Sequence, residues 1–374
     1  MQAISKPDPV LVTLATGLLL FGLLVLTSAS AVVGLSLFED QYFFIKRQVL
    51  FGVLPGLLAA YIFYKTPLAW WQKNAGVIMG LSLALLVMVL IPGIGATYEK
   101  NARSWINLFG FSFQPAEFVK LGLILFFSGY LLNRKDKIND WQNGFLPALT
   151  VGLLPVGLLL LQPDVGTASI MFALVLGLLF FAGAKIKHLS ALLLIGVVAF
   201  GIMIAMAPYR LHRVTTFLHP ELDPLGVGYQ INQAYLAIGS GGIFGLGLGH
   251  SRQKFQYLPE VHADSIFAVM AEETGFVFTI IFLLILYFLI RRLFSLAAGC
   301  TNDYERLVLA GIATWLALQS LLNIGAIIGL LPLTGVPLPF ISHGGSLLLT
   351  TLAAMGIALQ ISSNPQNRKT KYEK

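Results

Sequence analysis

The residues best suited to chemistry lie at the end of the longest polar loop in the sequence. The stretch 257–268 places Asp264 immediately before an apolar segment that begins at Ser265. A carboxylate at the mouth of a membrane span is costly unless the protein uses it. Asp264 is therefore the leading candidate for a general base, because a carboxylate can accept a proton from a substrate hydroxyl. The alternative is a helix cap, since Asp is favoured just before an apolar helix.

A second pair of ionisable residues lies inside an apolar segment. Glu117 and Lys120 are three residues apart on a predicted helix that Pro115 opens, and this spacing places both side chains on one face. One interpretation is a buried ion pair within the helix bundle. The other is a binding site in which Lys120 helps to neutralise a phosphate group while Glu117 orients it.

Three further charged residues lie near the predicted outer ends of apolar segments. Arg47 and Arg103 could bind a phosphate group through the bidentate geometry of the guanidinium group, or could be ordinary interfacial anchors. Asp164 lies in a loop too short to leave the bundle. It could hold one of these arginines, help to bind a divalent cation, or cap the following helix.

Two acidic residues follow Asp264 within the next apolar segment. Glu272 and Glu273 come eight and nine residues later, which on a continuous helix places them roughly 12–13 Å deeper in the membrane. At that distance from Asp264, neither glutamate could act on the atom with which Asp264 reacts. We expect a structural role with a polar partner in the bundle, although acids in mid-membrane also suit a proton relay in a transporter.

The composition identifies the class of protein that must position these residues. Of the 374 residues 57% are hydrophobic and 11% charged, whereas soluble domains carry about 25% charged residues. Apolar runs close to the roughly 20 residues that span a bilayer recur along the chain. They predict an all-α polytopic membrane protein with ten transmembrane helices, near residues 10–37, 48–64, 75–95, 115–132, 145–161, 166–184, 189–208, 265–290, 305–330 and 343–361.

The placement of Lys and Arg sets the predicted orientation. Basic residues are more numerous on the side that carries both termini, so the sequence predicts cytoplasmic termini and a large extracytoplasmic loop, 209–264, between helices seven and eight. Residues 1–361 form one predicted membrane domain, and 362–374 a disordered cytoplasmic tail. The net charge of +7 then reflects topology and contact with membrane lipids, not nucleic-acid binding.

The extracytoplasmic segments contain two unusual stretches. Within the large loop, residues 229–238 predict an amphipathic helix on the membrane surface, and 239–249 is rich in glycine but fits no nucleotide-binding spacing. Three prolines between 331 and 342 must end a span and fold the chain back. We expect this break to leave Ser342 and His343 facing a cavity.

Metal sites have little support in the sequence. Cys300 is the single cysteine, and no two histidines have the helical spacing of a metal site. No cofactor is required on this evidence. A divalent cation, Mg²⁺ or Mn²⁺, could bind through Asp264 together with phosphate groups of a substrate.

Several motifs in order along the chain resemble one family. The chain is similar to the SEDS family (shape, elongation, division, sporulation), which includes RodA and FtsW. The resemblance runs nearly end to end and includes the ten-span layout. It rests on 103–106, 114–121, 162–167, 223–230, 258–273 and 335–342. Residues 251–254 look nearer the FtsW branch, whereas Ala263, Ser265 and His343 stand where Thr, Phe and Tyr are expected.

The resemblance implies a peptidoglycan glycosyltransferase in the bacterial cytoplasmic membrane. It would polymerise lipid II, a polyprenyl-linked disaccharide, into glycan at the outer face, with a class B penicillin-binding protein as its partner. Asp264 matches the proposed catalytic aspartate. The implied substrate-binding set comprises Arg47, Arg103, Glu117, Lys120, Asp164, Glu260, Ser342 and His343.

Two other functions remain open at this point. A transporter that flips lipid II would use charged residues along a path through the membrane, and Glu117, Lys120, Glu272 and Glu273 are compatible with one. A scaffold that only recruits partners would leave the costly Asp264 and Lys120 unused. Most candidate groups lie at one face of the membrane, which favours surface chemistry.

Overall fold

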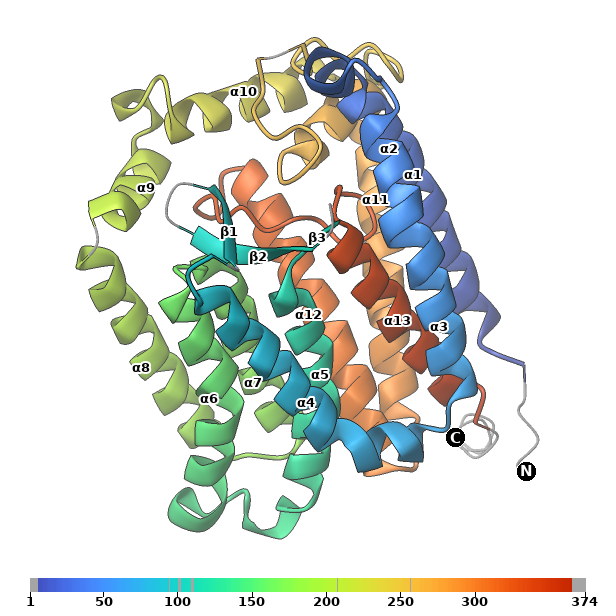
Figure 1. Cartoon of the computed structure of the whole chain (residues 1–374), viewed down its shortest axis with the longest axis vertical. Coiled ribbons are helices and arrows are strands. Elements are labelled where there is room, and N and C mark those ends of the chain that lie inside the picture. The colour runs from blue at the N-terminus through green and yellow to red at the C-terminus, as the bar shows by residue number, and fades with distance from the viewer. Residues whose placement is uncertain are drawn as a thin grey trace.

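A bundle of long apolar helices forms most of the molecule (Figure 1). The computed structural model describes residues 6–93, 95–99, 102–108, 111–206, 208–255 and 257–364. Within these ranges nine helical segments are long and apolar enough to cross a membrane, and α7 (Val165–Phe181) is a shorter apolar helix. The nine are α1 (Pro9–Phe38), Phe43–Lys65, α4 (Leu68–Leu90), α5 (Pro115–Leu132), Trp141–Leu161, α8 (Ile186–Ala205), α11 (Ile266–Ala298), α12 (Asp303–Ile327) and α13 (Gly345–Ser362).

Two of these segments are composite. The segment Phe43–Lys65 joins α2 (Phe43–Gln48) to α3 (Leu54–Lys65) through a π-helical turn, Val49–Val53. The segment Trp141–Leu161 begins with a π-helical turn, Trp141–Phe145, and continues as α6 (Leu146–Leu161). Such turns insert an extra residue into the helical hydrogen-bond ladder and often occur near functional sites.

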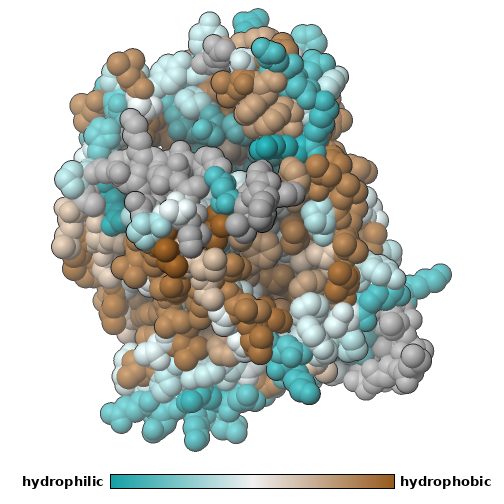
Figure 2. All heavy atoms as spheres, viewed as in Figure 1, coloured by the Kyte–Doolittle hydropathy of each residue, from teal (hydrophilic) through white to brown (hydrophobic). Residues whose placement is uncertain are grey.

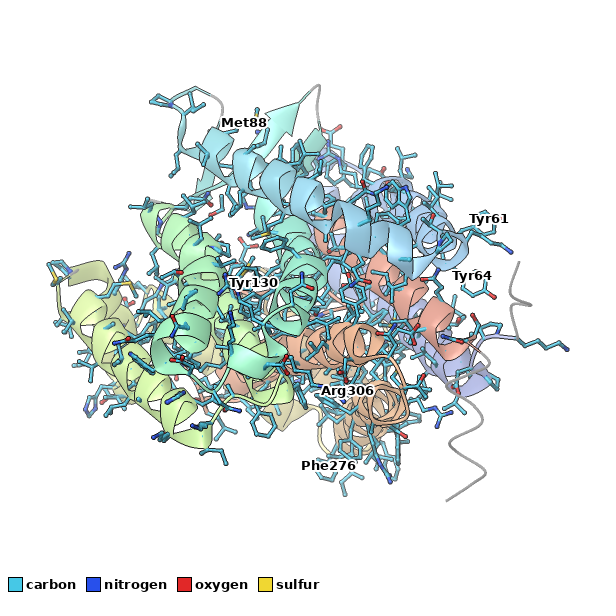
Figure 3. All side chains as sticks on the ribbon, turned by 90° about the horizontal axis from the view of Figure 1, so that it is seen from below. Tyr61, Tyr64, Met88, Tyr130, Phe276 and Arg306 are labelled. Carbon is cyan, nitrogen blue, oxygen red and sulfur yellow. The ribbon has the colours of Figure 1, made fainter. Side chains whose placement is uncertain are left out.

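The first and last helices of the structure have neighbouring ends, as expected if both termini lie on one side of the membrane. Asp8 caps α1 by accepting a hydrogen bond from Leu11 N at 2.9 Å, and its own N–H donates to Ser362 Oγ at the end of α13 at 3.1 Å. Hydrophobic side chains cover the middle of the molecule and hydrophilic ones gather at its lower end (Figure 2). Phe276 and Tyr61 project outward from the rim of the bundle, as lipid-facing side chains do (Figure 3).

The core lies between α5, α12 and α13, whose side chains are mostly buried, whereas α8 is largely exposed. Close approach of α3 to α13 depends on Gly356, where a Cβ atom would lie 2.3 Å from the carbonyl oxygen of Ala60. The central helices α5 and α12 carry polar groups into the interior of the bundle. These are Glu117 and Lys120 on α5 and the polar face of α12.

The outer end contains structure that the sequence did not predict. Three short antiparallel strands in the order β1-β2-β3 connect α4 to α5. They are β1 (Gly95–Glu99), β2 (Ala102–Leu108) and β3 (Phe111–Phe113), so the fold is not purely helical. The predicted span 75–95 lies several residues too late in the sequence. The helix there, α4, begins directly after Pro67 and ends before Pro92. The fragments α9 (Pro208–Leu218), η4 (Pro220–Leu222) and α10 (Val227–Ser240) lie across this end, and α10 agrees with the predicted amphipathic helix.

The eighth predicted span is broken near its start. Gly275 has φ 74° and ψ −179°, so residues 266–274 and 276–298 are two helices joined at a sharp turn. The ring centroids of Phe267 and Phe282 lie 6.5 Å apart, and that of Phe282 lies 5.8 Å from that of Phe21 on α1. The two segments therefore run side by side in opposite directions, as a helical hairpin with Gly275 at its tip.

This hairpin corrects the predicted depth of Glu272 and Glu273. Glu273 contacts Ser28 on α1 at 2.6 Å, and Ser28 lies seven residues nearer the outer end of α1 than Phe21, about 10 Å on a helix. Because residues 266–274 rise towards the outer surface, both glutamates lie outward of Asp264. The prediction that they lie deeper was wrong, since it assumed one continuous helix.

Candidate functional site

Asp264 lies at the inner end of the chain segment that enters the bundle from the extracytoplasmic loop. Its side chain is half-buried, and Oδ1 lies 3.4 Å from Gln230 Nε2 of α10 and 3.4 Å from Ser265 Oγ. Ser265, and not Asp264, is the N-cap residue of α11. Asp264 lines a small pocket with the outer end of α12 and the proline-containing segment. The other lining residues are Asn323, Ala326, Ile327, Leu333, Thr334, Gly335 and Val336.

Side chains that donate hydrogen bonds to the backbone hold the Asp264 loop from two sides. Asn323 Nδ2 donates to Asp264 O at 2.9 Å and to Val336 O at 2.8 Å. Ser342 Oγ donates to Ala263 O at 2.6 Å and accepts from Leu338 N at 2.8 Å. These bonds fix both the loop and the segment that faces it, so the position of the carboxylate is set by α12 and by residues 336–342.

The proline-containing segment ends α12 as predicted, but it does not leave Ser342 in an open cavity. Ser342 is 2% exposed and its hydroxyl is engaged in the bonds just described. His343 donates its backbone N–H to His262 O at 2.8 Å, and its ring packs edge-on against Phe44 at 5.2 Å. The chain folds back against the Asp264 loop, which buries Ser342 and leaves His343 half-buried, so the expectation of a cavity at Ser342 was wrong.

Gln48 is a buried residue of this site that the sequence reasoning missed. It is 1% exposed, its Nε2 donates to Ser342 O at 3.2 Å, and its Oε1 accepts from Gly344 N at 2.9 Å. The side chain thus joins the end of α2 to the folded-back segment through two hydrogen bonds. The available signal was a polar amide at the start of an apolar run, although its partners lie almost 300 residues away in the sequence.

Glu117 and Lys120 form a buried ion pair beside α12. Lys120 Nζ donates to Glu117 Oε1 at 2.6 Å and to Gln319 Oε1 at 2.7 Å, and lies 5.0 Å from the ring of Trp315. Gln319 Nε2 in turn donates to Pro337 O at 2.9 Å. The polar face of α12, formed by Trp315, Gln319 and Asn323 at four-residue spacing, therefore links the ion pair to the proline-containing segment. Gln319 and Asn323 were also missed, although this spacing in an apolar helix marks one face.

Asp164 caps α7, as one of its predicted interpretations requires. Its Oδ1 accepts from Thr167 N at 3.0 Å, and its Oδ2 lies 3.4 Å from Gln114 Nε2. Desolvation raises the pKa of Asp164, and the hydrogen bonds from Thr167 and the positive charge of Lys120 counter part of that rise. Asp164 is therefore within electrostatic reach of the ion pair.

Of the two predicted arginine ligands, the structure describes the side chain of Arg47 but not that of Arg103. Arg47 is exposed on α2, with its guanidinium carbon 4.8 Å from the centroid of the Phe43 ring. Arg103 belongs to β2, but its side chain lies outside the described part of the structure. Arg213 of α9 was not predicted. Its Nη1 approaches Leu333 O at 3.5 Å, at the rim of the Asp264 pocket.

Two histidines and one glutamate surround the loop on its α2 side. The rings of His262 and Phe44 lie 4.2 Å apart, and the exposed Glu260 Oε2 is 3.9 Å from His262 Nε2. Desolvation lowers the pKa of His262 to about 4. The pKa of His343 falls to about 3, because of burial and then the charges of His262 and Arg47. Both imidazoles are therefore neutral at physiological pH.

Among the described residues, no three His, Cys, Asp or Glu side chains converge as metal ligands. Among the described side chains, the arrangement offers the half-buried carboxylate of Asp264, with Arg213 at the rim of its pocket and further cations at Arg47 on α2 and Lys120 on α5. Such a set can accept a proton and stabilise an anionic leaving group.

Comparison with known proteins identifies the family. Residues 9–367 match the family model of the FtsW, RodA and SpoVE proteins, described as cell cycle proteins. The chain belongs to the FtsW/RodA/SpoVE family. It is 41% identical over 358 residues to stage V sporulation protein E of Bacillus subtilis, covering 96% of this chain and 97% of that protein. It is 38% identical over 360 residues to the probable peptidoglycan glycosyltransferase FtsW of Trichlorobacter lovleyi, covering 96% and 94%.

Solved structures show the same family fold. A chain from a structure on the coordination of polymerization and crosslinking by a peptidoglycan synthase complex aligns with TM-score 0.75 and 32% identity, over 97% of this chain and 98% of that one. The rod shape determining protein RodA of Thermus thermophilus aligns with TM-score 0.71 and 31% identity, over 95% and 96%. The predicted resemblance and the multi-pass helical membrane fold are confirmed.

Proposed function

We propose that this FtsW/RodA/SpoVE protein is a peptidoglycan glycosyltransferase that polymerises lipid II at the outer face of the bacterial cytoplasmic membrane. Relatives along almost the whole chain carry the name of this activity. The observation that supports the chemistry most strongly is the half-buried carboxylate of Asp264, which lines a pocket at the outer end of α12 and is held through its backbone by Asn323.

In this proposal Asp264 acts as the general base. It accepts the proton of the acceptor sugar hydroxyl as that oxygen bonds to the anomeric carbon of the donor. The bond from that carbon to the diphosphate oxygen breaks, its electron pair leaves with the polyprenyl diphosphate, and the anomeric configuration inverts. Partial exclusion of water around a fixed carboxylate favours this proton transfer, because the base needs little reorganisation at the moment of reaction.

We propose that arginine side chains bind the leaving diphosphate. Arg47 is exposed in the outer part of the segment Phe43–Lys65, and Arg103 and Arg213 come from β2 and α9. Guanidinium groups bind phosphate oxygens in pairs, which suits a diphosphate. Lys120 is already engaged by Glu117 and Gln319, so it contributes its charge through the buried network with Asp164, and contacts phosphate only if the ion pair separates.

A divalent cation fits this chemistry without a dedicated cage. Mg²⁺ commonly takes one or two carboxylates and completes its shell with substrate phosphates and water. Asp264 would be the protein ligand, and a bound Mg²⁺ or Mn²⁺ would supply further positive charge for the diphosphate. His262, His343 and Glu260 shape the α2 side of the loop.

A structural relative supports the proposal of a transpeptidase partner. One aligned chain comes from a peptidoglycan synthase complex that couples polymerization to crosslinking. We propose that this protein likewise works with a class B penicillin-binding protein, and the FtsW and SpoVE names of its sequence relatives are compatible with the predicted FtsW branch.

A lipid II flippase is the second candidate, and the buried Glu117–Lys120 pair favours it. Glu272 and Glu273 no longer support that function, since they lie at the outer end. The test is reconstitution of the protein with its partner in liposomes that carry labelled lipid II. A polymerase converts outward-facing lipid II into long glycan and leaves inward-facing lipid II in place. Redistribution of lipid II without glycan would contradict the polymerase and support the flippase.

A further inference from the structure

Two buried carboxylates outside the reaction site organise the extracytoplasmic loop. Glu272 is fully buried and accepts hydrogen bonds from Ser251 Oγ, from Arg252 N at 3.0 Å and from Gln253 N at 3.3 Å. Ser240 Oγ at the end of α10 adds a fourth bond at 3.1 Å. One carboxylate thus binds the start of the segment 251–273 and the end of α10 at once.

Glu273 forms a buried ion pair with the same segment. Lys254 Nζ donates to Glu273 Oε1 at 2.8 Å, and both side chains are at most 4% exposed. Ser28 Oγ of α1 donates to the same carboxylate at 2.6 Å and accepts from Gly249 N at 3.1 Å. The pair therefore fastens the loop to α1 as well as to α11.

The glycine-rich segment completes this attachment through its backbone. The turn at Gly275 breaks the helical ladder and frees N–H and C=O groups that need partners. Residues 242–247 provide them in four bonds, Leu246 N to Glu272 O at 3.0 Å, Gly247 N to Glu273 O at 3.0 Å, Phe276 N to Gly242 O at 2.9 Å and Val277 N to Ile243 O at 3.1 Å. A Cβ at Gly275 would lie 2.1 Å from Gly245 N, so glycine is required for this contact.

We propose that Glu272, Glu273 and Lys254 form a latch that positions Asp264 for the reaction. The latch joins the two ends of segment 251–273, and Asp264 lies at the far tip of that closed loop. Residues 266–274 form a rigid helix of roughly 13 Å between the latch and Asp264. Fixing its outer end therefore fixes the depth and direction of the carboxylate, while Asn323 and Ser342 hold the inner end. This inference rests on the proposed function for its effect on rate, but its structural part does not.

The three latch residues are positioning residues, since they lie beyond reach of the reacting atoms. Removing one partner of the pair leaves a buried charge uncompensated, which the loop can relieve by moving outward. A displacement of about 1 Å at a reacting group can lower a rate roughly 100-fold. We therefore expect a loss in kcat. The KM for lipid II should be almost unchanged, because the arginines that we assign to the diphosphate, Arg47, Arg103 and Arg213, lie on α2, β2 and α9, outside the segment that the latch closes.

The first experiment measures the position of residue 264 without reference to activity. In full-length protein with Cys300→Ser, Asp264→Cys introduces one thiol, and its rate of reaction with a membrane-impermeant maleimide is followed with and without Glu273→Gln. The latch predicts labelling several-fold faster when Glu273 is changed. Ser28→Ala is the milder second variant, and it carries the test where Glu273→Gln does not fold. Equal labelling rates in a folded latch variant overturn the proposal.

The second experiment measures turnover with Asp264 intact, in complex with the partner. Glu273→Gln is expected to lower kcat roughly 100-fold, and the exchanged pair Lys254→Glu with Glu273→Lys to recover part of it. Asp8→Asn is the matched control, because it removes one charge from the Asp8–Arg292 pair at the cytoplasmic end and keeps the capping oxygen. A higher KM at unchanged kcat overturns the latch. An inactive wild type contradicts the proposed function alone, since the labelling result stands by itself.

Discussion

Replacement of the buried Glu117–Lys120 pair separates the two interpretations that the sequence leaves open. Lys120→Met removes a cation that is 0% exposed and leaves Glu117, 2% exposed, without its ion-pair partner. Breaking a buried pair in this way costs about 3–5 kcal/mol of folding stability. We expect this single variant to unfold at a clearly lower temperature in detergent than the wild type.

The double variant Glu117→Gln with Lys120→Met isolates function from stability. Both charges are gone, and replacing a buried pair by neutral groups of similar volume is often close to neutral. Gln319 Oε1 still accepts from Trp315 Nε1 at 2.7 Å, so the face of α12 keeps that bond. The double variant should recover most of the lost stability.

The assay compares thermal unfolding with glycan synthesis from labelled lipid II for the wild type, the single variant and the double variant. If the buried charge assists the departing diphosphate, the double variant is stable but makes much less glycan. Near-normal synthesis by a stable double variant would refute a functional charge at Lys120 and leave the ion pair with a structural role alone.

Three shorter predictions concern the rest of the site. Gln48→Leu removes the bonds to Ser342 and Gly344 and should lower stability by about 1–3 kcal/mol per buried group left unpaired, which chemical denaturation would detect; Gln48→Glu, which cannot donate to Ser342 O, is the comparison, and equal stability of Gln48→Leu and wild type would contradict it. Arg47→Lys should impair lipid II polymerisation almost as much as Arg47→Ala, because Lys lacks the bidentate geometry, and full activity in both would show that Arg47 is only an interfacial anchor. Because burial lowers the pKa of His262 to about 4, the unfolded chain binds a proton that the folded one does not, and this residue should cost about 1 kcal/mol of stability at pH 5.5 relative to neutral pH. Stability is thus greatest above pH 6.5 and falls towards pH 4, and a melting temperature with the same pH dependence in His262→Phe would contradict this.

The class of protein could be predicted because it depends on local sequence, and the candidate site at Asp264 rests on the same kind of local signal. Long apolar runs specify membrane helices wherever they occur, and Asp264 is visible as a carboxylate at the edge of one. Pro115 and the prolines after residue 331 mark helix boundaries for the same local reason.

The helical hairpin could not be predicted in the same way. Gly275 inside an apolar helical pattern signals only a modest cost, and the chain reverses there because residues 242–247 supply partners for the freed backbone groups. Those partners come from a loop whose conformation is fixed by Glu272 and Glu273 themselves. Depth in the membrane was therefore misjudged for both glutamates, although their need for polar partners was recognised.

The roles of the buried amides depend on contacts that are distant in sequence. Gln48, Gln319 and Asn323 stand out as polar residues in apolar segments, but their functions follow from the backbone carbonyl groups that they meet at 336–342. Asp164 and Ser342 show the converse case. The sequence placed them near the site, and the structure shows that their oxygens also cap a helix and hold the Asp264 loop.

The most direct test of a general base at position 264 is the rate of glycan synthesis by Asp264→Asn. The variant keeps the size of the side chain and the backbone bond to Asn323, so it should fold, bind the partner and bind lipid II as the wild type does. With the complex supplied with labelled lipid II, the predicted result is long glycan from the wild type and none from Asp264→Asn. Glycan from a folded Asp264→Asn complex at a rate near that of the wild type would contradict the mechanism.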